Sequence, residues 1–127
     1  MAQQTFEIPR VEWSRELASF SAVHDNWLVS LEVLTQAQGA QPEIVGMPLT
    51  GITFERWNGG SIVIAAGRQP DAHVAHEIHE PTAIFVERTA SGADAALLVE
   101  AADGTRTVLR LRAAALPETV DGLTEWP

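Results

Sequence analysis

Two reactive residue types are missing from this chain. None of its 127 residues is cysteine, and all eight basic residues are arginine, so there is no lysine either. Without cysteine there can be no disulfide, no thiol nucleophile and no zinc–thiolate site. Without lysine there can be neither Schiff-base chemistry on a lysine amine nor a phosphate-binding P-loop lysine. These absences exclude several common enzyme classes.

Long apolar runs are missing as well. No stretch approaches the roughly 18 apolar residues that a membrane-spanning helix needs. Residues 1–7 contain neither a basic region nor an apolar core, so we expect no secretory signal. Together with the lack of cysteine, this indicates a cytoplasmic protein of bacterial type that has no membrane partner.

Positive charge is scarce. Seventeen acidic residues stand against eight arginines, which gives a net charge of −9. Such a surface repels a phosphate backbone, and no basic cluster is visible that would overcome the repulsion, so we expect no nucleic-acid partner. The acidity most simply keeps the protein soluble. An alternative that rests on the charge alone is an acidic mimic of nucleic acid that blocks a DNA-binding partner.

The first regular element is expected to be a helix over residues 10–23. Apolar side chains recur there every three or four residues and form one stripe: Trp13, Leu17, Phe20 and Val23. Pro9 suits the entry to a helix. The segment His24-Asp25-Asn26 is expected to end it.

After the helix the apolar period changes from 3.6 to 2, which is typical of strands. The first strand places one face inward: Trp27, Val29, Leu31 and Val33. A loop rich in Gln, Ala and Gly follows at 35–42. Two hairpin turns are indicated, Asn58-Gly59-Gly60 and Ala102-Asp103-Gly104. Further strands are expected at 43–45, 47–49, 52–57, 61–66, 83–88, 96–101 and 105–112.

One helix and many short strands predict an α+β fold within a single domain, 1–127. The N-terminal helix (10–23) should pack on a strongly bent antiparallel β-meander of seven or eight strands (27–112). A partly open barrel is one form that this sheet could take. Residues 113–127 are expected to form a C-terminal arm or short helix, with Trp126 as an anchor.

Three of the four histidines lie within residues 71–80, the one place where several groups able to bind a metal or move a proton are gathered: His73, His76 and His79. If the segment were helical, four side chains would share a face: His73, His76, Glu77 and Glu80. Such a set is workable for a divalent transition metal.

If the segment is a strand, the same residues separate. His76 would join Val74 and Ile78 on the apolar face, while His73, Glu77 and His79 would lie opposite. Residues four apart in a strand are about 13 Å apart, too far to share one ion. Only neighbours such as Asp71 with His73, or Glu77 with His79, could then act together. We prefer the strand, because the elements on both sides are strands and the segment is short for a stable helix.

Other chemistry-bearing residues have simpler interpretations. Glu87 and Glu100 lie on adjacent expected strands and could form a carboxylate pair. A cross-strand ladder of ion pairs is the simpler use of these carboxylates, with Arg88, Arg106, Arg110 and Arg112 as partners. The four tryptophans could line a ligand pocket, but are more typical of core or interface anchors.

The stretch from Trp27 to Leu111 resembles a family of short bacterial proteins known only as a domain of unknown function. The resemblance is carried by three segments: Ile8-Pro-Arg-Val-Glu-Trp13, His73-Val-Ala-His-Glu-Ile followed by Pro81, and Ala102-Asp-Gly-Thr-Arg-Thr-Val-Leu-Arg-Leu-Arg112. It covers most of the chain. It implies a compact bacterial domain, and it carries no activity or catalytic residue across.

Two function hypotheses remain. The first is a non-enzymatic binding or interaction module, homo-oligomeric or bound to a protein partner, because many short strands leave exposed sheet edges and no complete catalytic set is present. The second is a small metal- or ligand-binding enzyme centred on His73, His76 and His79, with Glu77 or Glu80 as base. No cofactor is expected for the first, and a divalent metal for the second.

Overall fold

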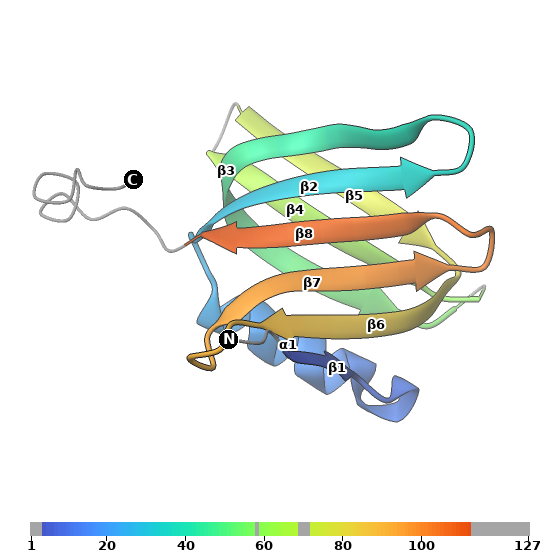
Figure 1. The fold of residues 1–127 in the computed structure, drawn as a ribbon, viewed down its shortest axis with the longest axis horizontal. Coiled ribbons are helices and arrows are strands. Elements are labelled where there is room, and N and C mark those ends of the chain that lie inside the picture. The colour runs from blue at the N-terminus through green and yellow to red at the C-terminus, as the bar shows by residue number, and fades with distance from the viewer. Residues whose placement is uncertain (1–3, 58, 69–71, 113–127) are drawn as a thin grey trace, which may run out of the picture.

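The computed structural model describes residues 4–57, 59–68 and 72–112 (Figure 1). Within them lies one α-helix, α1 (Trp13–Val23), preceded by the 3₁₀ turn η1 (Arg10–Glu12). The strands are β1 (Gln4–Glu7), β2 (Leu28–Thr35), β3 (Gly39–Glu55), β4 (Ser61–Arg68), β5 (Ala72–His79), β6 (Pro81–Arg88), β7 (Asp94–Ala101) and β8 (Arg106–Arg112). The expected arm at 113–127 with Trp126, the turn residue Asn58 and the carboxylate of Asp71 lie outside this range.

All eight strands form one antiparallel sheet that does not close, in the order β1-β6-β7-β8-β2-β3-β4-β5. The single meander that the sequence predicts is therefore wrong. There are two meanders, β2 to β5 and β6 to β8, and pairing between β8 and β2 joins them. β5 and β6 are consecutive in the chain but are not neighbours, because the backbone turns away at Glu80, where φ is +53°. Periodicity along the chain carries no signal of such a crossing.

β3 is the longest strand and belongs to both layers of the bent sheet. Its first part pairs with β2 and its last part with β4. In Figure 1 it curves from the layer in front to the layer behind. The loop predicted at 35–42 is confirmed only as a turn at 36–38, and the breaks predicted between 43 and 52 are wrong, because β3 runs unbroken from Gly39 to Glu55. Prolines at 42 and 48 are tolerated since this part of β3 has a strand on one side only.

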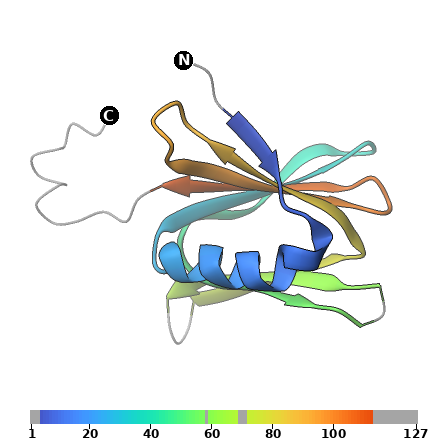
Figure 2. The same ribbon diagram turned by 90° about the horizontal axis from the view of Figure 1, so that it is seen from below.

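The predicted helix is confirmed, and it closes the mouth between the two layers (Figure 2). Three members of its apolar stripe are buried: Trp13, Leu17 and Phe20. The fourth, Val23, is 63% exposed, so the stripe is one residue shorter than expected. α1 packs chiefly on β3. The fold is mostly β, and the α+β description holds only in the loose sense that one helix completes the core.

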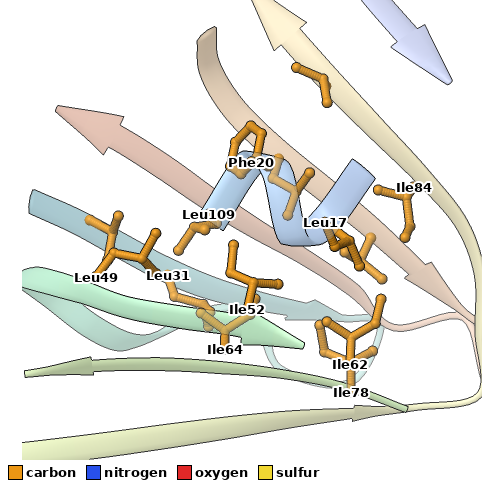
Figure 3. Packing of buried hydrophobic residues seen from close by; sticks show 14 of the residues in the cluster. Leu17, Phe20, Leu31, Leu49, Ile52, Ile62, Ile64, Ile78, Ile84 and Leu109 are labelled. Carbon is orange, nitrogen blue, oxygen red and sulfur yellow. The ribbon is translucent and has the colours of Figure 1, made fainter. Parts of the chain in front are cut away.

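The core lies between the helix and the two layers of the sheet (Figure 3). Leu17 and Phe20 of α1 belong to the same cluster as apolar side chains contributed by strands of both layers, among them Ile52, Ile64, Ile84 and Leu109. Strands such as β2, β4 and β6 supply these residues at alternate positions, as the period of two predicts. None of the helices in the described part of the chain is long and apolar enough to cross a membrane.

Truncating the helix stripe should cost much of the stability. Leu17 is fully buried, so Leu17→Ala should lower the free energy of unfolding by about 3 kcal/mol, through lost burial and the cavity left behind. Urea denaturation measures this. Val11→Ala, at a side chain that is 92% exposed, is the control and should change it by less than about 0.5 kcal/mol. Equal losses in both variants would contradict the packing described.

Candidate functional site

The segment with three histidines is a strand, β5, as preferred from the sequence. Its side chains alternate as expected: Ile78 is buried and His76 half-buried, while His73 and His79 are exposed. His76 lies opposite Ile64 of β4, which places it on the inner face. The assignment of the histidines to two faces is therefore confirmed.

This alternation prevents the three histidines from acting as one set of ligands. An ion pair within the segment joins His79 Nδ1 to Glu77 Oε2 at 3.9 Å, between side chains that are 76% and 49% exposed. Glu80 is not on the strand at all, since it occupies the turn toward β6, and the helical arrangement with Glu80 beside His73 is wrong. Among the residues described, no group of three or more histidines and carboxylates is placed to hold a metal ion.

The inner end of β5 borders a small pocket of about 160 Å³. Across it lie residues of the β7–β8 hairpin, including Asp103 and the buried Thr107. The Asp103 carboxylate accepts the Thr105 backbone N–H at 2.9 Å. This bond, helped by the Thr105 hydroxyl, holds the pKa of Asp103 below its ordinary value. The pocket thus has an anionic wall and two imidazoles, those of His76 and His79, but it is too small for most substrates.

The fourth histidine, His24, is the one whose ring is buried, and sequence reasoning treated it only as the end of a helix. It caps α1 with 2% of its surface exposed. Its Nδ1 lies 2.7 Å from the Phe20 carbonyl oxygen and its Nε2 lies 3.3 Å from Asp94 Oδ2. The ring also contacts the rings of Phe20 and Trp27, at centroid distances of 4.3 and 4.6 Å.

Both polar neighbours of His24 are oxygen atoms. A carbonyl oxygen can only accept, so Nδ1 is the donor in the contact with Phe20. The other ring nitrogen, Nε2, faces the Asp94 carboxylate. The ring thus connects the C-terminal end of α1 to the first residue of β7.

Asp94 extends this contact into a chain across four elements. Its Oδ1 accepts a 2.8 Å hydrogen bond from Nε of Arg88, whose guanidinium lies 5.2 Å above the Phe6 ring. We call this the His24–Asp94–Arg88 network. It connects the end of α1 to β7, β6 and β1, and it borders a cleft of about 400 Å³ between the helix and β1. Seventy residues separate His24 from Asp94 in sequence, so periodicity could not have revealed the network.

The carboxylate pair considered for Glu87 and Glu100 does not form. Glu87 is opposite Ala96 and Glu100 is opposite Ala83, which leaves the two four positions apart on neighbouring strands. The ladder of ion pairs is found instead. Its members include Arg106 with Glu100 at 3.9 Å, Arg110 with Glu32 at 3.8 Å and Arg88 with Asp94 at 2.8 Å.

Two of the four tryptophans act as the anchors expected. Trp13 is buried edge-on to Phe54 at 5.3 Å, and Trp27 is half-buried against His24. Trp57, in contrast, is 71% exposed beyond the end of β3. The tryptophans therefore do not line a common pocket among the residues described.

The comparison with known protein families identifies the chain. A family model described as "Family of unknown function (DUF5335)" matches residues 4–119, so the chain belongs to that family. The resemblance inferred from sequence is confirmed at this level. No curated protein matches the chain significantly. No solved structure does either.

Removing the charge from Asp94 should weaken the His24–Asp94–Arg88 network. Asp94→Asn keeps the shape of the side chain but leaves His24 and Arg88 without their carboxylate, and should lower the free energy of unfolding by about 2 kcal/mol. Glu100→Gln, which breaks an exposed pair with Arg106, is the matched control and should cost less than about 0.5 kcal/mol. Urea denaturation compares them; similar losses would show that the network adds nothing.

Divalent metals should not stabilise the protein. A metal bound only by the folded state would raise its melting temperature, but β5 places His73 and His76 on opposite faces. We expect Zn²⁺, Ni²⁺, Mn²⁺ and Fe²⁺ to leave the melting temperature unchanged in a thermal-shift assay. A rise with any of them that is lost in His73→Ala/His76→Ala would instead establish the metal-binding alternative.

Proposed function

We propose that this member of the DUF5335 family is a non-catalytic interaction module that pairs with a second copy of itself through the outer edge of β5. The observation that carries the proposal is the position of β5. It is an eight-residue strand at the end of the sheet, with β4 on one side and, in the described part of the chain, no strand on the other (Figure 1).

An edge of this length is a template for another strand. Its outward N–H and C=O groups have no partner within the sheet, and soluble proteins usually keep such edges short or covered. The opposite edge follows that rule, since β1 has only four residues. The outer face of β5 is also free of bulky apolar side chains, because its exposed positions are His73, Ala75, Glu77 and His79.

A second copy is the occupant that the residue pattern favours. Antiparallel pairing about a two-fold axis at Ala75 would place His73 of each copy opposite Glu77 of the other. The two contacts are equivalent by symmetry and bring together groups of opposite charge whenever the imidazole is protonated. The alanine at the centre adds no bulk between the two backbones. The histidines then serve recognition between copies, not metal binding or proton transfer.

Composition supports the remaining parts of the proposal. A net charge of −9 argues against a nucleic-acid partner. The lack of cysteine suits the bacterial cytoplasm, where we place the protein. We expect neither a cofactor nor a membrane partner for this role.

Like charges across the paired strands should weaken the dimer. His73→Glu would place two glutamates opposite each other at both symmetric contacts, and should raise the dimer dissociation constant roughly tenfold. Light scattering coupled to size exclusion, over a series of protein concentrations, measures it. The double variant His73→Glu/Glu77→Arg restores opposite charges and should recover the wild-type constant.

Thr53→Glu is the control, because it adds the same charge at an exposed position of β3, two strands away from the outer edge of β5. It should leave the dimer unchanged. A wild-type protein that stays monomeric at every concentration would overturn the proposal. So would a dimer that His73→Glu and Thr53→Glu affect equally.

A further inference from the structure

Half of the eight arginines pair with carboxylates of the same chain. Four form ion pairs within the described residues: Arg15, Arg88, Arg106 and Arg110. Arg10 and Arg56 form no ion pair with any carboxylate in that part of the structure. In a chain with more than twice as many acids as bases, two unpaired guanidinium groups are unexpected.

These two arginines line the same surface hollow. The hollow has a volume of about 520 Å³. It lies between the start of α1 and the end of β3, which are close together in Figure 2. Its lining residues are Arg10, Val11, Ser14, Phe54 and Arg56. Within this set from the described chain there is no carboxylate.

Arg10 is held in place by contacts that leave most of its donors free. Its guanidinium lies 4.5 Å above the Trp13 ring, and its Nη1 donates a hydrogen bond to the Pro81 carbonyl oxygen at 3.3 Å. An arginine has five N–H donors, so the remaining ones can serve a ligand. Gly60 packs closely beside two of the lining residues, because a Cβ there would lie 3.1 Å from Phe54 and 3.6 Å from Arg10.

The other residues that line the hollow indicate what the uncharged part of the ligand should be. Val11 is 92% exposed and Phe54 is half-buried, so they offer apolar surface beside the two charges. Ser14 adds a hydroxyl in the first turn of α1, where the helix dipole also favours an anion. Guanidinium groups match carboxylate and phosphate oxygens with pairs of parallel hydrogen bonds. A volume of this size is typical of small-molecule sites.

We propose that this hollow binds a small organic anion. The carboxylate or phosphate group lies between Arg10 and Arg56, and the apolar body of the ligand lies on Val11 and Phe54. The site shares no lining residue with β5, so it is independent of the pairing proposed for that strand.

Titration of the ¹⁵N-labelled protein with four probes tests the site. Phenyl phosphate and phenylacetate carry the two anionic groups on an aromatic ring; benzyl alcohol carries the ring alone and inorganic phosphate the charge alone. We expect saturable amide shifts at residues 10–14 and 54–56 with at least one aromatic anion. Whichever of the two binds more tightly identifies the anionic group. Benzyl alcohol and inorganic phosphate should bind at least tenfold more weakly than that anion.

Arg56→Gln is the diagnostic variant, since Arg56 is exposed and its loss should not disturb the fold. It should weaken the aromatic anion about tenfold. Arg110→Gln removes the same charge from β8, where Arg110 pairs with Glu32, and should leave the affinity unchanged. The proposal is overturned by the absence of saturable shifts, by equal binding of benzyl alcohol, or by equal effects of the two substitutions.

Discussion

The structure depends on the burial of one helix face in the mouth of an open sheet. The sheet bends but does not close, so its inner surface would be exposed to solvent if the helix did not cover it. Trp13, Leu17 and Phe20 form the covering face of the helix, and they belong to one apolar cluster with residues from strands of both layers. Apolar area removed from water is the main favourable term in folding. Because α1 has only 11 residues, each of these three side chains makes a large part of the apolar contact between the helix and the two layers.

Polar contacts complement this packing by fixing the helix at its two ends. At the start, Arg10 stacks on Trp13 and binds the carbonyl of Pro81. At the end, His24 and Asp94 join the helix to β7. Both contacts link the helix to the second meander, whereas its apolar face packs chiefly on β3 of the first. The helix therefore adds to the pairing of β2 with β8 in holding the two meanders together.

Much of this arrangement can be predicted from local sequence pattern. The helix stripe, the two hairpin turns and the alternation in β5 all depend on spacing between near neighbours, which a sequence displays directly. Gly59 and Gly60 have φ of +83° and +92°, as the predicted turn requires. The histidines could be separated into two faces for the same reason, and this separation argues against a metal ion shared by all three.

What could not be predicted depends on contacts between distant segments. β1 has no distinctive pattern of its own and is a strand only because β6 pairs with it. The continuity of β3 was hidden by its prolines and glycines, and the His24–Asp94 contact by its separation in sequence.

The pairing of β2 with β8 has a further consequence, for folding. Leu31 and Leu109 are far apart in the chain, so their pairing closes a long loop. Closing that loop costs more conformational entropy than forming a hairpin, and we therefore expect this pairing to form late in folding. Hairpins within each meander can form early. The apolar face of the helix, however, can be fully buried only after β2 and β8 have paired, because it packs on residues from both layers. We therefore expect the domain to fold cooperatively.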